Sequence, residues 1–240
     1  MTEILLIFLI SVVASAVQTV VGFGYIIFAM ALFPLFLPVG QCLVLAQLGG
    51  LFMSLWLIWG KLDQVEWKKV LWPALFASLG GIAGLLFLRS ITGAVYMKIL
   101  GVILILLAAW MMKFSSLVKI RPTVVNGVIV GTVGGLMGAL FGVSAPALVL
   151  YYTSNADSKE NYTACLQMTM IIQTAVCLLG RAGLGMWPEG VWPLCLPAFA
   201  GIFLGKFPGR ALYGRLDLRT FKIVVYAFIA IFGIYIFFSN

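Results

Sequence analysis

The stretch LMGALFGVSAP at residues 136–146 lies within a long apolar run. Gly142 and Pro146 are unusual inside such a run, because glycine removes side-chain constraint and proline removes a backbone donor. Inside a bilayer, the freed backbone groups must find partners in protein or in water. The stretch is therefore either a kink satisfied by neighbouring helices or the lining of a cavity.

The composition identifies the class of protein. Of 240 residues, 63% are hydrophobic and 9% are charged, and the mean hydropathy is +1.16. Soluble domains carry about a quarter of their residues as charged side chains. Apolar runs of membrane-spanning length recur from end to end, which predicts an all-α, polytopic membrane protein. The net charge of +8 lies in short loops, so it indicates orientation in the membrane and not binding of nucleic acid.

The N-terminal segment and the cysteines have simple interpretations. The segment MTEILLIFLISVVASA carries Glu3 and no early Lys or Arg, so it is expected to be a retained first helix and not a signal peptide. The chain has four cysteines in apolar context, no CxxC pair and no histidine. We expect free thiols that act as small hydrophobic side chains, with no metal site and no cofactor.

The chain contains an internal duplication. A shift of 120 residues aligns rare residue types as well as glycines. The matched pairs are Gly22/Gly142, Gln47/Gln167, Gly60/Gly180, Lys61/Arg181, Trp67/Trp187 and Trp72-Pro73/Trp192-Pro193. At a shift of 121 residues instead of 120, the pattern GxxxGxxxxR occurs twice, as Gly80, Gly84, Arg89 and as Gly201, Gly205, Arg210. We therefore predict two membrane repeats, residues 1–122 and 123–240.

Each repeat divides into similar apolar segments, 8 to 10 in the whole chain. They lie at about 4–20, 25–37, 42–60, 70–88 and 94–112, and at about 124–140, 144–153, 163–180, 191–205 and 219–238. The opening pair of each repeat is short for two crossings and is interrupted by GFG or GVSAP. Each pair is two short tilted helices, a re-entrant hairpin or one broken helix.

Loop charges favour an odd number of crossings in each repeat. If each opening pair enters and turns back, twelve of the fifteen Lys and Arg residues lie in loops on one side. If each pair is a single span, the basic residues divide almost evenly. The positive-inside rule then predicts inverted repeats with both termini on the non-cytoplasmic side.

These features together resemble the TauE/SafE family, the sulfite and organosulfonate permeases of bacteria. The shared features are two related halves, a glycine-bearing break near the start of each half, and a small-residue helix followed by a basic residue. The resemblance covers residues from about 4 to 238, although this chain has only GFG and GVSAP where the family carries denser glycine runs. It implies transport of a small sulfur-containing anion across the bacterial inner membrane.

The residues of the two breaks also suit an anion. An oxyanion can be held by backbone N–H groups at helix N-termini, which carry the positive end of the helix dipole. No acidic residue lies within an apolar segment, which argues against a cation substrate. The candidate substrate-binding residues are Gly22, Phe23, Gly24, Gln47, Gly142, Val143, Ser144 and Gln167.

Four basic residues are candidates for a gate or vestibule: Lys61, Arg89, Arg181 and Arg210. Snorkelling to the membrane interface is the alternative role for Arg89 and Arg210. Likewise, Gln47 and Gln167 could bond only across helices, and the GxxxG motifs are expected to be helix-packing faces.

The sequence thus predicts a secondary transporter of a small anion, acting by alternating access and without catalytic residues. The alternatives are an integral-membrane enzyme acting on a lipid, an accessory subunit, and a transporter of a different small solute. The expected partners are the anion and the lipid bilayer. The sequence leaves the coupling ion, the direction of transport and the formation of a homo-oligomer open.

Overall fold

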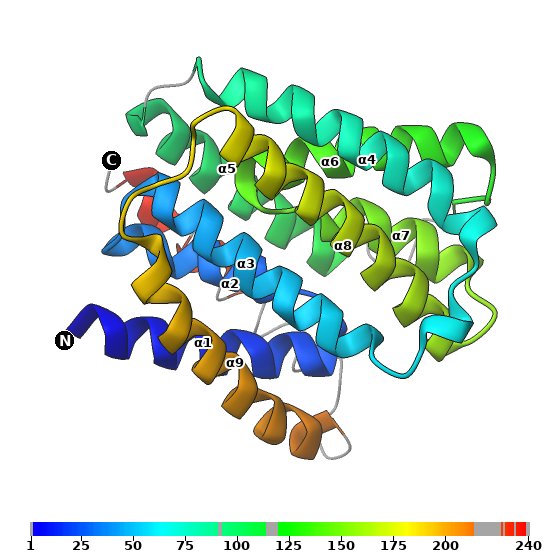
Figure 1. Cartoon of the computed structure of the whole chain (residues 1–240), viewed down its shortest axis with the longest axis horizontal. Helices are drawn as coiled ribbons and strands as arrows, with labels where there is room; N and C mark the ends of the chain where they lie inside the picture. The colour runs from blue at the N-terminus through cyan, green and yellow to red at the C-terminus, as the bar shows by residue number, and fades with distance from the viewer. Residues whose placement is uncertain are drawn as a thin grey trace. The chain divides into compact units, whose positions relative to one another are not determined.

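The computed structural model describes residues 2–90, 93–113, 120–213, 227, 229–232 and 234–238, and this part of the chain is helical (Figure 1). Its helices are α1 (Thr2–Val21), α2 (Tyr25–Leu32), α3 (Val39–Ile58), α4 (Trp67–Leu88), α5 (Gly93–Lys113), α6 (Val124–Phe141), α7 (Ala145–Asn155), α8 (Lys159–Gly183) and α9 (Val191–Tyr213). Two short 3₁₀ turns, η1 (Phe33–Leu35) and η2 (Leu62–Gln64), follow α2 and α3. The predicted all-α class is confirmed for these residues.

Six of the described helices are long and apolar enough to cross a membrane: α1, α3, α4, α6, α8 and α9. A helix of twenty residues spans about 30 Å, which is the thickness of the hydrocarbon core. The predicted segment at 94–112 coincides with α5. Of the predicted segment at 219–238, residues 227, 229–232 and 234–238 are described, and these are helical.

The two expected interruptions are present. α1 ends at Val21 and α2 begins at Tyr25, while α6 ends at Phe141 and α7 begins at Ala145. At 8 and 11 residues, α2 and α7 reach only about 12 and 16 Å and cannot span a bilayer. Each opening pair is therefore one helix of spanning length followed by a short one. Whether the pairs are re-entrant, and whether the repeats are inverted, stays a prediction.

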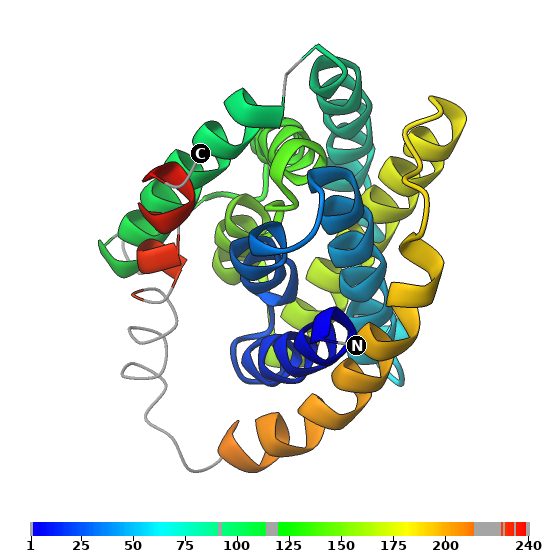
Figure 2. The same cartoon turned by 90° about the vertical axis from the view of Figure 1, so that its left-hand side faces the viewer.

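The chain forms two compact units, and each draws on both predicted repeats. Unit 1 comprises Met1–Gly50, Ile91–Ser116 and Pro188–Asn240, and unit 2 comprises Leu51–Ser90 and Leu117–Trp187. In unit 1, α1 packs along α9, dark blue beside orange in Figure 2. In unit 2, α4 packs along α6 and also against α8. Because α1 corresponds to α6 in the repeat, and α9 to α4, the two principal helix pairs are equivalent.

Small residues form the seam within each pair. A Cβ on Gly80 of α4 would lie 2.5 Å from the carbonyl oxygen of Thr132 on α6. In unit 1, a Cβ on Gly205 of α9 would overlap the carbonyl of Val12 on α1. The expectation that these motifs are packing faces is confirmed for both seams.

The seams also correct the sequence alignment of the repeats. Val12 and Thr132 are 120 residues apart, so the packing makes Gly80 equivalent to Gly205 and not to Gly201. In the same way, Gly84 lies against Leu136 of α6, and Gly209 lies against Ala16 of α1. The match of Gly80 and Gly84 with Gly201 and Gly205 was therefore wrong by one helical turn. Arg89 and Arg210 are consequently not equivalent positions.

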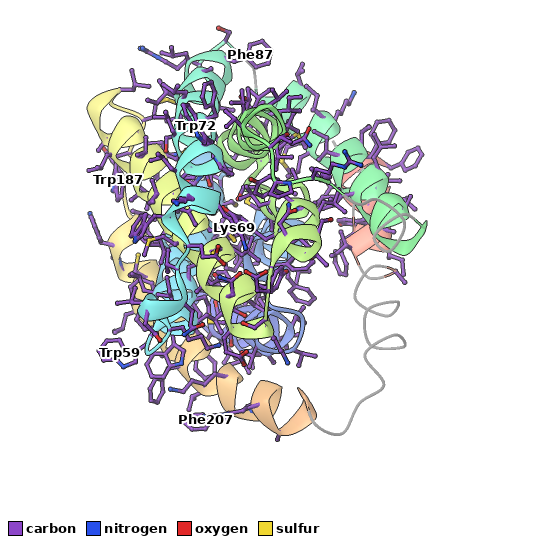
Figure 3. The ribbon with its side chains drawn as sticks, turned by 90° about the vertical axis from the view of Figure 1, so that its right-hand side faces the viewer. Trp59, Lys69, Trp72, Phe87, Trp187 and Phe207 are labelled. Atoms are coloured by element: carbon purple, nitrogen blue, oxygen red, sulfur yellow. The ribbon has the colours of Figure 1, made fainter. Side chains whose placement is uncertain are left out.

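Large apolar side chains cover much of the outer surface of the helices. Trp59 is 85% exposed, and Phe87 and Phe207 are more than half exposed. All three point away from the ribbon in Figure 3. Such a surface is suited to lipid, because a bilayer does not penalise exposed apolar groups as water does.

Candidate substrate-binding site

The break in unit 1 is organised around Gln18, near the end of α1. The backbone N–H of Gly22 donates to the Gln18 carbonyl oxygen at 2.7 Å, which closes the last turn of α1. The side-chain Oε1 of Gln18 then accepts from the backbone N–H of Tyr25, the first residue of α2, at 2.9 Å. One residue thus completes the end of one helix and caps the beginning of the next.

Glycine is required at this break by the backbone. Gly22 has φ +88° and Gly24 has φ +122°, in the region that L-residues rarely adopt. Both glycines are half-buried, whereas Phe23 and Tyr25 are buried. The Tyr25 hydroxyl is hydrogen-bonded to Ser11 Oγ at 3.1 Å, which anchors α2 to α1.

The break in unit 2 follows the same plan. Gly142 has φ +73° and its N–H donates to the Gly138 carbonyl at 3.0 Å, while the N–H of Val143 donates to the Met137 carbonyl at 3.3 Å. Ser144 is the N-cap of α7, and Pro146 lies in the first turn, where a missing N–H costs little. The left-handed glycines of the two breaks are 120 residues apart, as the repeat predicts.

The polar groups around the second break differ from those around the first. The position equivalent to Gln18 is Gly138, and Gln173 Nε2 lies 2.8 Å from where a Cβ on Gly138 would be. Gln173 of α8 therefore fills the space that Gln18 fills in unit 1. Its Nε2 donates to Cys177 Sγ at 3.2 Å.

A buried cation also belongs to the second break. Arg181 of α8 is 1% exposed, and its Nη2 donates to the carbonyl oxygen of Ala139, in the last turn of α6, at 2.7 Å. A cation at a helix C-terminus is favoured by the helix dipole. We expected Arg181 as a gate or vestibule residue, and the structure places its side chain in the interior of unit 2.

The two predicted glutamines lie beside the short helices. Gln47 is 2% exposed and lies two residues before Gly49, where a Cβ would overlap the ring of Tyr25. Gln167 is fully buried and lies two residues before Thr169, whose hydroxyl is hydrogen-bonded to Tyr152 of α7. Each glutamine therefore belongs to a helix that contacts the short helix of its own unit.

The remaining basic candidates lie at the surface. Arg89 follows α4 and is exposed, Arg210 near the end of α9 is exposed, and Lys61 between α3 and η2 is half-buried. The candidate residues divide between the two units. Those of unit 1 are Gly22, Phe23, Gly24, Gln47 and Arg210, and those of unit 2 are Gly142, Val143, Ser144, Gln167, Lys61, Arg89 and Arg181.

Sequence reasoning missed Gln18, Gln173 and a polar network at the start of α4. Lys69, labelled in Figure 3, bonds Glu66 at 2.9 Å and Asp157 at 2.8 Å. Asn161 Nδ2 donates to Glu66 Oε1 at 2.7 Å, so the network links α4 to the α7–α8 connection. The hydrogen bond from Lys69 holds the pKa of Asp157 below its ordinary value. The sequence signal was the placement of acids and amides in two loops on the same predicted side.

In the described part of the chain, six helices of spanning length, two broken pairs and buried polar groups at the breaks define a multi-pass membrane protein. The family model described as "Sulfite exporter TauE/SafE" matches residues 7–236, so the chain belongs to the TauE/SafE family. This is a family of membrane transporters of the sulfite or anion exporter type, and the resemblance found in the sequence is confirmed. No curated protein and no solved structure matches the chain.

Proposed function

We propose that this protein is a secondary transporter that moves sulfite, a sulfonate or another small organosulfur anion across the bacterial inner membrane. The observation that carries the proposal is the repeated break. In each unit a left-handed glycine ends a long helix, and a short helix begins three residues later among buried side chains. Family membership supports the same class of solute.

The chemistry of the breaks favours an anion. The first N–H groups of a helix have no partner within that helix, and they carry the positive end of its dipole. α2 and α7 each offer such an end, and Ser144 adds a hydroxyl while Gln47 and Gln167 add amide donors. A hydrogen bond of this kind is worth about 1 kcal/mol net, and more with a charged ligand.

The buried charged groups also favour an anionic solute. In the described part of the chain no acidic side chain is buried, and Arg181 is the one charged residue whose side chain is. Carriers of protons and cations keep ionisable acids or histidines inside the helical bundle. The interior of this protein is instead suited to a negatively charged solute.

Alternating access would follow from an inverted arrangement of the two repeats, residues 1–122 and 123–240. The loop charges support this arrangement, with re-entrant opening pairs and both termini on the non-cytoplasmic side. The equivalence of the α1–α9 and α4–α6 pairs supports the duplication itself. Lys61, Arg89 and Arg210 would attract anions toward the two vestibules.

The test is ligand-dependent thermal stability of the purified protein, followed by flux in proteoliposomes. Sulfite, methanesulfonate, sulfate, small carboxylates and matched cations are compared, because a ligand that prefers the folded state raises its apparent stability. We expect stabilisation by sulfur oxyanions and its loss in the double variant Gln47→Ala/Gln167→Ala. Gln64→Ala removes an exposed glutamine of η2 and is the matched control. Stabilisation by cations alone, or by none of these ligands, contradicts the proposal.

A further inference from the structure

The amide of Gln18 has a fixed orientation. The backbone N–H of Tyr25 is a donor, so the side-chain atom that it meets at 2.9 Å must be the acceptor Oε1. The other arm of the same amide is then the NH₂ group. Because Oε1 meets the first residue of α2, Nε2 also lies beside the N-terminus of this helix.

This NH₂ group makes no hydrogen bond to any of the residues that the structure describes. Gln18 is 1% exposed, and its Nε2 is a buried donor that makes no hydrogen bond. Buried donors are almost always satisfied, and an unsatisfied one destabilises the folded protein. A buried donor held in place at a helix N-terminus is therefore prepared for an acceptor that the described part of the chain does not supply.

The surroundings of Gln18 provide further donors and a route of approach. α2 begins at Tyr25, whose N–H already donates to Gln18, and the N–H groups of the next two residues, Ile26 and Ile27, are not needed within the helix. Gly22 and Gly24 beside it are half-buried, so their backbone is partly open to a solute. A Cβ on Gly24 would lie 3.6 Å from Val17, so a side chain would occupy space that glycine leaves open.

The second break lacks this feature. Its equivalent position is Gly138, and the amide that takes the space belongs to Gln173, whose Nε2 already donates to Cys177. The two breaks therefore have a similar backbone conformation, but they differ in the side-chain amide donors beside it.

We infer that Gln18 Nε2 and the N-terminus of α2 form an oxyanion-binding subsite, which takes one oxygen of the substrate on the amide and a second on backbone N–H groups. This inference rests on the proposed function and specifies its substrate class. The ligand is an anion with at least two acceptor oxygens, such as a sulfonate, and chloride serves as the comparison anion without oxygens. The unit 1 break is the one that selects the oxyanion.

The test uses Gln18→Glu in the full chain. A glutamate has the same shape and still accepts from the Tyr25 N–H, so it keeps the cap on α2 while it removes the donor and adds negative charge. Gln18→Met, with nearly the same volume, removes the donor without adding charge. Gln64→Glu places the same charge at an exposed glutamine and is the control.

The measurement is the apparent Kd for methanesulfonate and for chloride, from the concentration dependence of the melting temperature. We expect the wild type to bind methanesulfonate in preference to chloride, and both Gln18 variants to bind methanesulfonate about 10- to 100-fold more weakly. Melting without ligand shows that each variant is folded.

Two results would overturn the inference, and they are distinguishable. If either folded Gln18 variant binds methanesulfonate as tightly as the wild type, Gln18 is only a cap, and the proposed function is untouched. If the wild type itself is stabilised by no sulfur oxyanion, the proposed function fails and the subsite fails with it.

Discussion

Replacing Gly80 by alanine tests the α4–α6 seam directly. A Cβ at this position would lie 2.5 Å from the carbonyl oxygen of Thr132, 3.1 Å from its Cα and 3.2 Å from its carbonyl carbon. All three are backbone atoms of α6, so no side chain can rotate away. To restore ordinary contact, the two helices must separate locally by about 0.9 Å.

The size of the effect follows from two opposing contributions. Forcing a methyl group into a packed interface costs about 1–3 kcal/mol, while alanine in a helix gains up to about 1 kcal/mol over glycine. Because the overlapped atoms belong to the backbone, the cost here lies in the upper part of that range, about 2–3 kcal/mol, and the net loss of stability is about 1–2 kcal/mol. For a chain of this size each kcal/mol lowers Tm by about 2–4 °C, so we expect a decrease of about 2–8 °C.

The assay can use the protein's own cysteines. Cys42, Cys165, Cys177 and Cys195 are free and buried, so a thiol-reactive fluorophore reports their exposure as the protein unfolds on heating. Gly183→Ala is the control, because a Cβ there meets nothing within 4 Å. A Gly80→Ala protein that melts within 1 °C or so of the Gly183→Ala control refutes the tight seam.

Three further predictions concern other parts of the molecule. Ser15→Ala removes the hydrogen bond from Ser15 Oγ to the Ile202 carbonyl in the α1–α9 seam, and the thiol assay should show a loss of about 1 kcal/mol; an unchanged Tm would contradict this role. Because the folded-state pKa of Asp157 lies below its unfolded value of about 3.9, its contribution to stability is present above that pH and is lost as the pH falls below it. Melting curves from pH 6 to pH 3 should therefore decline less in Asp157→Asn than in the wild type, and parallel curves would count against the network. In the inverted topology, an impermeant thiol reagent added outside should label a cysteine replacing Arg89 but not one replacing Arg210, and the reverse pattern would overturn that topology.

The sequence predicted the positions of the two breaks, because they depend on backbone geometry. Gly22 and Gly142 adopt positive φ, and no L-residue does so cheaply, so the glycines themselves marked the ends of α1 and α6. The repeat of 120 residues then held through the start of α2 and α7. A local sequence pattern can predict a local backbone conformation, such as these helix ends.

The register of the seams could not be predicted, for a physical reason. α9 carries glycines at 201, 205 and 209, one per turn. The two glycines of α4, four residues apart, can therefore be aligned with the first two of them or with the last two. Only contact with the partner helix decides between them. The same holds for Gln18, since its role depends on meeting Tyr25 across the break and its position in the second repeat is Gly138.

Arg181 illustrates a related limit. The predicted segment 163–180 placed this residue at a helix end, and it does lie in the last turn of α8, but its side chain is buried and donates to the Ala139 carbonyl. A basic residue near the end of an apolar run is ordinarily assigned to the interface. Here a helix C-terminus in the interior provides an acceptor that the sequence does not reveal.

The pairing of α1 with α9 has a consequence for biosynthesis. Unit 2 can complete its seam as soon as residues up to 183 have been made, because α4, α6 and α8 follow one another closely in the chain. Unit 1 cannot, since Ser15 of α1 meets Ile202 of α9, which is translated 187 residues later. Until then, the part of α1 around Ser15 lacks the contact with α9 and lies in lipid or against the insertion machinery. α1 thus leaves the ribosome long before the helix that packs along it, and a chain truncated before α9 should leave this face of α1 exposed to quality-control proteases.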